Sequence, residues 1–384
     1  MIFKILYRNA FRHKLRTFLT VSGMAVAVLA FGLLHTVIEA WYAGVEASSA
    51  TRLVTRNSIS LIFPLPLAYR DTIRHIEGVM VVSSGNWFGG IYIDRKNFFA
   101  NFAVEPESYL DLYPEYVIPD DQRMRFMRDR RGCLAGKKLA ERFGWSVGDT
   151  ITLTGTLFPG KWDFILSAVY EGSDKNIDET LFFFHWDYLN ESLKKQAPLS
   201  SDQVGFYIIG IKNPYMAARI SEAVDATFKN SLAETRTETE KAFQLGFVAM
   251  SETIIKAIQL VSLVVIFIIL AVVANTMGMS VRERIREFAV FKTLGFRAWQ
   301  ISFLIIGESM VITILGGVTG MLLTFPAAKE FSSAVGRFFP VFNITWQTMC
   351  MDFAVTVIVG VIAGIVPAYR AVTVNITEGF RRIG

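Results

Sequence analysis

The 384-residue sequence has few of the residue patterns that carry catalysis or bind metals. Its two cysteines, Cys133 and Cys350, lie far apart in different kinds of segment, so neither a disulfide framework nor a zinc site is predicted. The histidines are His13, His35, His75 and His185. Their spacing does not suit a metal, and no HExxH or Ser-His-Asp pattern accompanies them. We therefore expect no enzyme site, no metal site and no cofactor in this chain.

A nucleotide-binding loop is missing as well. The stretch GCLAGKK at 132–138 superficially resembles a phosphate loop, but a Walker A sequence has four residues between its glycines and a Ser or Thr after its lysine. Here three residues separate the glycines, and Lys138 replaces the hydroxyl. An acidic stretch holds Asp94, Glu105, Glu107 and Asp111. We interpret these carboxylates as solvated surface rather than as a catalytic pair.

Long apolar runs dominate what is present. With 52% hydrophobic and 19% charged residues and a mean hydropathy of +0.38, the chain is too apolar for a soluble protein and too charged to lie in a membrane throughout. Apolar runs occur at Phe18–Ile38, Ile254–Met279, Phe303–Phe325 and Met349–Tyr369. Each matches the roughly 20 residues that cross a bilayer as a helix. A signal peptide has only about 7–15 apolar residues, so we prefer an uncleaved first span.

The distribution of positive charge predicts the orientation. Residues 1–16 carry five basic residues and no acid, and the segments 282–297 and 370–384 are also rich in Arg and Lys. In contrast, residues 43–250 hold 23 basic and 26 acidic residues. Because Lys and Arg near the ends of spans stay in the cytoplasm, both termini are expected to be cytoplasmic and the large domain periplasmic. The expected location is a bacterial inner membrane.

The predicted fold class is a membrane protein with four transmembrane α-helices and a large α+β extracytoplasmic domain between spans 1 and 2. The expected segments are a cytoplasmic amphipathic N-terminal helix (1–17), span 1 (18–40), the extracytoplasmic domain with its stalk (41–250), span 2 (251–280), a cytoplasmic helix (281–300), span 3 (301–326), a short extracytoplasmic loop (327–348), span 4 (349–369) and a cytoplasmic tail (370–384).

Within the large domain, short β-branched and aromatic runs broken by Gly and Pro predict strands and turns. Strands are expected at Ser58–Phe63, Val79–Ile93, Thr150–Thr154, Trp162–Val169 and Val204–Ile211, and helices at Tyr69–Ile76, Leu134–Phe143 and Met216–Phe228. The polar segment Glu238–Ala249 predicts a helix that runs directly into span 2. At 1.5 Å per residue this helix would form a rigid stalk of roughly 18 Å.

The segment SVRERIREFAVFKTLG, residues 280–295, predicts a short amphipathic helix. Its apolar face holds Val281, Ile285, Phe288 and Ala289. Glu283 can meet Arg286, Arg284 can meet Glu287, and Gly295 is placed to cap the end of the helix. Composition leaves two interpretations open, a membrane-surface anchor and a docking element for a partner.

The chain has a span, a large outside domain, a second span and then this cytoplasmic helix. This order and the motif of the helix together resemble the permeases of the MacB/FtsX/LolC-LolE group of ABC transporters. Similar stretches are RNAFRHKLRTFLTVSGMAVAV, GCLAGKKLAERFGWSVGDTITL, GGVTG and IVPAYRAVTVNITEGFR. The resemblance implies a dimer of permeases that works by mechanotransmission with a separate cytoplasmic ATPase dimer, which binds the ATP and Mg. The coupling-helix residues that it implies for ATPase docking are Arg282, Glu283, Arg284, Arg286, Glu287, Lys292 and Gly295.

Inside the spans, we single out Glu308 as the one acid well inside an apolar run. It is expected to pair with Arg16 or water for structural reasons rather than to couple protons. The pairs Gly316 with Gly320 and Gly360 with Gly364 permit close approach of helices. Packing within one subunit and dimerisation explain these pairs equally well.

The expected function is ATP-driven export or extraction of a lipid, lipoprotein, peptide or hydrophobic compound. The alternative is an FtsX-like signalling subunit that activates an extracytoplasmic cell-wall hydrolase, and a free-standing membrane enzyme is disfavoured. Expected partners are the ATPase dimer, a second permease copy as homodimer or heterodimer, membrane lipid, and a periplasmic adaptor or acceptor; no nucleic acid is expected. A hydrophobic cleft for a lipid could be lined by six phenylalanines, although we interpret most of them as core residues. They are Phe98, Phe99, Phe102, Phe182, Phe183 and Phe184.

Overall fold

Long apolar helices make up one of two compact units in the computed structural model, which describes residues 6, 8–335 and 339–373. Among the described residues, four helices are long and apolar enough to span a membrane, which confirms the predicted fold class. They are α2 (Lys14–Ala47), α10 (Glu252–Glu283), α12 (Ala298–Val335) and α13 (Trp346–Thr373). All four extend beyond the predicted apolar runs, because the polar residues at their ends continue the helix.

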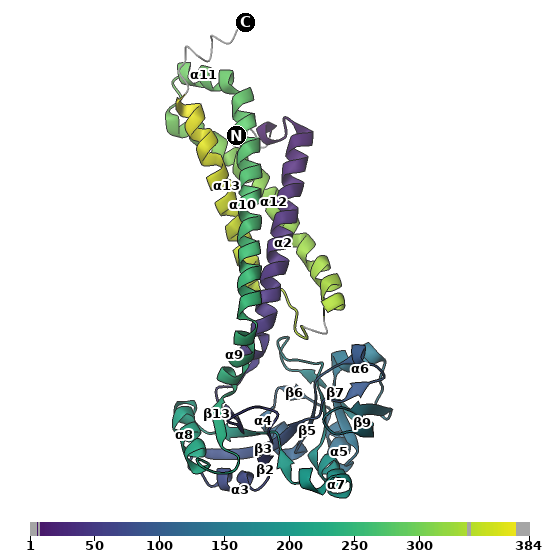
Figure 1. Cartoon of the computed structure of the whole chain (residues 1–384). Coiled ribbons are helices and arrows are strands. Elements are labelled where there is room, and N and C mark those ends of the chain that lie inside the picture. Colours follow the sequence, from purple (N-terminus) through teal and green to yellow (C-terminus); the bar gives the residue numbers. More distant parts are fainter. Residues whose placement is uncertain (1–5, 7, 336–338, 374–384) are drawn as a thin grey trace. The chain divides into compact units, whose positions relative to one another are not determined.

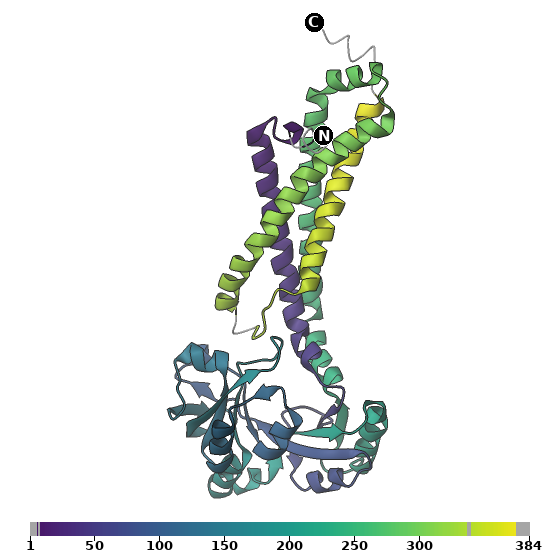
Figure 2. The same cartoon turned by 180° about the vertical axis from the view of Figure 1, so that it is seen from behind.

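The four helices form a bundle, with α10 and α13 side by side and α12 inclined to them (Figures 1 and 2). Apolar side chains from all four helices meet in its interior, among them Met24, Ile269, Ile305 and Ala363. A short helix, α11 (Ile285–Thr293), follows α10. The predicted N-terminal helix 1–17 is not one element, because a turn at residues 11–13 separates the described residues before it from Lys14, where α2 begins.

A large mixed sheet forms the centre of the second unit, Trp41–Ser251 with Arg337–Val341. Its strands in the described chain, in spatial order, are β13 (Thr235–Thr239), β1 (Arg52–Asn57), β12 (Phe206–Ile211), β3 (Val79–Trp87), β5 (Asn101–Val104), β10 (Phe182–His185), β7 (Gly132–Gly136), β9 (Gly160–Gly172), β8 (Thr150–Gly155) and β4 (Ile91–Tyr92). β6 (Tyr116–Val117) pairs with β9. The β10–β5 and β7–β9 pairs are parallel, and β2 (Leu65–Pro66) pairs with β11 (Gln203–Val204).

Helices cover this sheet and divide its core in two. They are α3 (Tyr69–Arg74), α4 (Pro106–Leu112), α5 (Asp120–Arg128), α6 (Lys137–Phe143), α7 (Trp186–Gln196), α8 (Ala217–Thr227) and α9 (Glu240–Met250), with short 3₁₀ turns at Arg95–Asn97, Pro198–Ser200 and Pro214–Met216. Successive side chains of a strand point to opposite faces. Accordingly Phe182 and Phe184 pack in one apolar cluster and Phe183 in the other.

The phenylalanines that could have lined a cleft are therefore mostly core. Phe182, Phe183 and Phe184 are at most 1% exposed, and Phe99 is 5% exposed. Phe98 is exposed and stacks on Trp87. β10 is buried on both faces, and the sequence of such a strand is a continuous apolar run. A segment that lines a hydrophobic ligand site has the same kind of sequence, so the sequence alone could not distinguish the two.

Several predicted elements of the domain are confirmed and others are wrong. The expected strands at 150–154 and 162–169 and the helices near 69–76 and 216–228 are present within a few residues. The expected strand at 79–93 is divided into β3 and β4, which lie far apart in the sheet, and that at 204–211 into β11 and β12, which lie in different sheets. Ser58–Phe63 is a loop, and the strand is the preceding Arg52–Asn57, whose polar residues hid it. Leu134–Gly136 belongs to β7, so the helix ending at Gly144 starts only at Lys137.

The predicted stalk also differs from expectation. Glu238 and Thr239 end β13, and Thr239 caps α9 through its hydroxyl. Ser251 has φ −99° and ψ 5°, which is not helical, so α9 and α10 are two helices rather than one rigid rod.

Candidate docking helix and domain junction

The helix α11 begins at a break in the chain and ends in a defined cap. Arg284 leaves helical geometry with φ −105°, which separates α11 from α10. At the other end Gly295 has φ 86°, a left-handed conformation that glycine adopts without strain. The Gly295 N–H donates to the Lys292 carbonyl and the Phe296 N–H to the Phe291 carbonyl, the two bonds of a Schellman cap. These features fix the length of α11 to two and a half turns.

Arg284 fastens α11 to the membrane helix α12. Its side chain is 8% exposed, and its Nη1 lies 2.7 Å from Oε2 of Glu308, which is 6% exposed. Its Nε donates to Glu287 at 2.9 Å, and its guanidinium lies 5.4 Å from the ring centre of Phe288. Glu308 thus pairs with Arg284 and with the Ser280 hydroxyl, whereas the sequence had suggested Arg16 or water as its partner. The expectation of a structural ion pair holds, and its partner differs.

Two further contacts tie α11 to the turn that precedes α2 and to the end of α13. Arg12 pairs with Glu287, and Lys292 Nζ donates to the Val372 carbonyl at 2.6 Å. Burial alone would raise the pKa of Glu287, but hydrogen bonds from Arg12 and Arg284 outweigh it and lower that pKa. At the end of α10, Glu283 pairs with Arg16 at 2.5 Å, a contact across the bundle that the spacing of the sequence did not predict.

The opposite face of α11 is exposed and partly apolar. Arg286, Val290 and Leu294 follow one another at helical spacing, and all three are exposed. Leu294 is 69% exposed, and Phe296 and Trp299 continue the surface past the cap. We call Arg286, Val290, Leu294, Phe296 and Trp299 the outer face of α11. Of the residues implied for docking, Arg282 and Arg286 are exposed, and Arg284, Glu287 and Lys292 are held by the contacts described above. The sequence analysis did not identify the apolar residues of the outer face, because a single apolar residue at each position gives no sign of its exposure.

The glycine pairs lie inside the bundle. A methyl group at Gly320 would come 2.6 Å from the Ala25 carbonyl oxygen, so α12 and α2 touch backbone to backbone there. Gly316 lies against Met24 in the same contact. Gly360 and Gly364 of α13 face Thr313 and Ile306 of α12. All four glycines therefore serve packing within this chain.

In the second unit, a buried cluster of charges joins the start of α9 to the sheet. Arg52 of β1 is 5% exposed, and its guanidinium lies 2.7 Å from carboxylate oxygens of both Glu240 and Glu115. Glu240, the first residue of α9, also accepts bonds from the Tyr113 hydroxyl at 2.9 Å and the Ser49 N–H at 2.8 Å. We call these five residues the junction. Burial and the neighbouring Tyr109 and Glu240 raise the pKa of the Tyr113 hydroxyl, so it stays protonated and donates.

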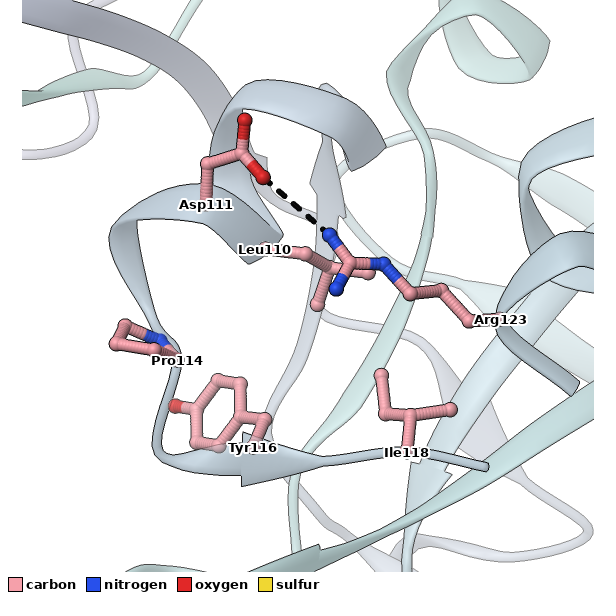
Figure 3. A pocket seen from close by; sticks show the side chains of 6 residues that line it. All are labelled: Leu110, Asp111, Pro114, Tyr116, Ile118 and Arg123. Carbon is pink, nitrogen blue, oxygen red and sulfur yellow. Dashed lines mark hydrogen bonds and ion pairs between the residues drawn. The ribbon is translucent and has the colours of Figure 1, made fainter. Parts of the chain in front are cut away.

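The described part of the second unit contains one pocket whose lining can be compared with a catalytic site. A pocket of about 350 Å³ is crossed by the Arg123–Asp111 ion pair at 3.3 Å and walled by Leu110, Tyr116 and Ile118 (Figure 3). Ion-paired and apolar walls supply no activated nucleophile. In the described part of the chain no group of three His, Cys, Asp or Glu side chains could hold a metal. The GCLAGKK stretch is the buried strand β7 followed by α6, not a phosphate loop.

Comparison with known sequences places these features in a family. The model of the MacB-like periplasmic core domain matches residues 17–231, and that of the FtsX-like permease C-terminal region matches residues 260–376. An ABC transporter permease of Methanocaldococcus jannaschii is 22% identical over 98% of this chain and 96% of its own length.

A probable syringafactin export ATP-binding/permease protein of Pseudomonas syringae is 30% identical over 162 residues, which span 40% of this chain but only 24% of that protein. The crystal structure of the periplasmic region of MacB from Actinobacillus actinomycetemcomitans is 9% identical, with a TM-score of 0.38, over 53% of this chain and 95% of that structure. Since one family model covers more than half of the sequence and the other covers its C-terminal spans, the chain belongs to the MacB/FtsX-type permeases of ABC transporters.

Proposed function

We propose that this permease is driven by a separate cytoplasmic ABC ATPase dimer that binds the outer face of α11. The observation that carries the proposal is that α11 is anchored on one face and exposed on the other. Apolar side chains next to an arginine suit a protein interface, whose buried centre is rich in aromatic and aliphatic residues and Arg. A helix that served only as a surface anchor would not need the Arg284–Glu308 pair.

The contacts of α11 support transmission of movement rather than passage of a substrate between the spans. Displacing α11 would pull on α12 through Arg284, on the turn before α2 through Arg12 and on α13 through Lys292. In the soluble unit, the junction fastens the start of α9 to β1. We propose that ATP-driven motion reaches the soluble domain along this route, with both termini and α11 in the cytoplasm and the domain outside the inner membrane.

We propose that the transport activity is export or extraction of a hydrophobic compound, lipid, lipoprotein or peptide. A relative named for syringafactin export and the MacB-like core domain support this class over signalling to a cell-wall hydrolase. We further propose that a second permease copy completes the transporter and that a periplasmic adaptor or acceptor receives the cargo.

Purification of the permease in mild detergent tests the docking proposal. The variant Val290→Asp/Leu294→Asp places charge on the outer face of α11 without touching its anchors. The matched control is Leu245→Asp/Met250→Asp on α9, which also changes two exposed apolar residues of a helix. We expect a Walker A-containing ATPase to be retained by wild type and control and lost from the α11 variant.

Retention of the ATPase by the α11 variant, or its absence from wild type even after cross-linking, would contradict the proposal. Glu283 and Glu287 are unsuitable test positions, because their carboxylates pair with Arg16 and Arg12. Reversing their charge would disturb the bundle as well as the surface.

A further inference from the structure

A carboxyl group without a partner is buried in the helix bundle. Asp352 of α13 is 0% exposed, and neither of its carboxyl oxygens has a hydrogen-bond partner. Glu308 was expected to be the one acid well inside an apolar run, but Asp352 also lies in the fourth span. Six residues separate it from Trp346, the first residue of α13, which places it about 9 Å along the helix axis.

Small residues on the neighbouring helices make room for this carboxyl. A methyl group added to Gly32 of α2 would lie 2.8 Å from one Asp352 oxygen and 3.3 Å from the Thr324 methyl of α12. The nearby hydroxyls do not serve the carboxyl, since Thr324 donates to the Gly320 carbonyl and Thr36 to the Gly32 carbonyl. Residues of α2, α12 and α13 therefore surround Asp352, and among the described residues no hydrogen-bond donor reaches its carboxyl group.

A second acidic residue lies closer to the end of the same helices. The carboxylate oxygens of Glu39 on α2 accept hydrogen bonds from the hydroxyls of Thr345 at 2.8 Å and Thr348 at 2.7 Å. His35 Nε2 lies 3.6 Å from Glu39, and these two side chains are 21% and 19% exposed. Gly32, His35 and Glu39 share one face of α2 at spacings of three and four residues.

The two acidic sites form one continuous polar seam. On α13, Thr348 and Asp352 are four residues apart and therefore on one face, opposite Glu39 and Gly32 of α2. Glu39 is within electrostatic reach of Asp352. At this end of α10, Glu252 and Lys256 pair with each other at 2.7 Å and are exposed. Among the described residues, no cation is recorded as paired with Asp352.

An ionised carboxylate in an apolar interior is stable only with a cation or several donors around it. Within residues 8–335 and 339–373 the structure places neither at Asp352, and Glu39 repels a second negative charge. We propose that Asp352 is a proton-binding site of the bundle, loaded while α2, α12 and α13 are packed together and emptied by way of Glu39 and His35 when they separate.

Proton release is then linked to movement of the helices. A rearrangement that lets water reach Asp352 allows it to ionise, so the packed bundle holds one proton more than the opened bundle. Because opening releases a proton, acidic pH favours the packed bundle and alkaline pH favours the opened one. This inference does not depend on the ATPase, on α11 or on the identity of the cargo.

Infrared difference spectroscopy of the full chain in lipid nanodiscs tests the site. A protonated carboxyl in apolar surroundings gives a carbonyl stretching band separate from that of ionised carboxylates. We expect this band at neutral pH in wild type, its loss in Asp352→Asn, and its retention in Glu39→Gln. Asparagine fills the same space without a charge. The same band in wild type and Asp352→Asn would overturn the proposal, and so would its loss only in Glu39→Gln, because the proton would then belong to Glu39.

A second measurement needs no variant. Dicyclohexylcarbodiimide reacts with protonated carboxyls in apolar surroundings, and peptide mapping locates the adduct. We expect an adduct on Asp352 of the wild-type chain whose yield falls as the pH is raised. Absence of this adduct at every pH, while other carboxyls are modified, would contradict a protonated Asp352.

Discussion

Replacing Arg52 should lower the free energy of unfolding of the soluble domain more than the other single substitutions described below. Arg52→Met retains much of the aliphatic stem but leaves the carboxylates of Glu240 and Glu115 without their cation. The guanidinium also donates to the Leu112 carbonyl at 2.9 Å and lies 4.1 Å from the Tyr113 ring centre. Deleting one partner of a buried ion pair costs about 3–5 kcal/mol, because the remaining charge stays buried.

This cost corresponds to a large shift in thermal stability. For a domain of 150–250 residues, each kcal/mol lowers Tm by about 2–4 °C, so Arg52→Met should lower it by roughly 6–20 °C. Arg52→Lys should lose less, although one ammonium cannot reproduce the forked contacts of a guanidinium. The assay is thermal unfolding of the full chain in detergent, followed by intrinsic tryptophan fluorescence.

A surface ion pair provides the control for this prediction. Arg219 pairs with Glu77 at 3.3 Å, and both side chains are more than 70% exposed, so Arg219→Met should unfold as wild type does. The double variant Arg52→Met/Glu240→Met should recover part of the loss, since it removes one of the stranded charges. Equal Tm values for Arg52→Met and Arg219→Met would refute the view that the junction holds α9 to the sheet.

Three other measurements test separate parts of the account. Gly320→Ala should destabilise the helix bundle, because the new methyl would lie 2.6 Å from the Ala25 carbonyl oxygen. Gly278 has no atom within 4 Å of such a methyl, so Gly278→Ala should leave the thermal stability unchanged or raise it. Equal thermal midpoints for the two variants would contradict close contact of α2 and α12. Burial lowers the pKa of His185 below its ordinary 6.5, so the unfolded chain takes up the proton first as the pH falls. Stability should therefore decrease on going from about pH 7.5 to about pH 5.5, and the part of this decrease that His185 causes should disappear in His185→Gln. Burial also raises the pKa of the Cys133 thiol, so peptide mapping after maleimide treatment should find Cys133 unlabelled in the folded protein and labelled after denaturation; rapid labelling of the folded chain at Cys133 would show that β7 is not a buried strand.

The four candidate spanning helices were accessible from the sequence because hydropathy and length are local properties. Runs such as Phe18–Ile38 need only their own residues to specify a spanning helix. The break at Ser251 was not accessible, since no Gly or Pro marks it and the residues on both sides favour helix. The buried strand β10 was likewise missed, because its three phenylalanines depend on partners far away in the chain.

The candidate docking helix was only half predictable. Spacing correctly paired Arg284 with Glu287, because a separation of three positions is enough to specify a local contact. The partners of Arg284 and Glu283 on other helices, Glu308 and Arg16, required the packing of the bundle. Asp352 was overlooked for the same reason, since a carboxyl in an apolar run reveals its lack of partners only once its neighbours are known.

Photo-cross-linking from α11 tests the central claim most directly. A photoreactive amino acid in place of Leu294, which is 69% exposed, should capture the nucleotide-binding ATPase in cells. The same amino acid in place of Met250, which is 83% exposed on α9, should not. An ATPase adduct at Leu294 alone is the result that the account predicts. Adducts at neither position, or at Met250 alone, would contradict docking on the outer face of α11.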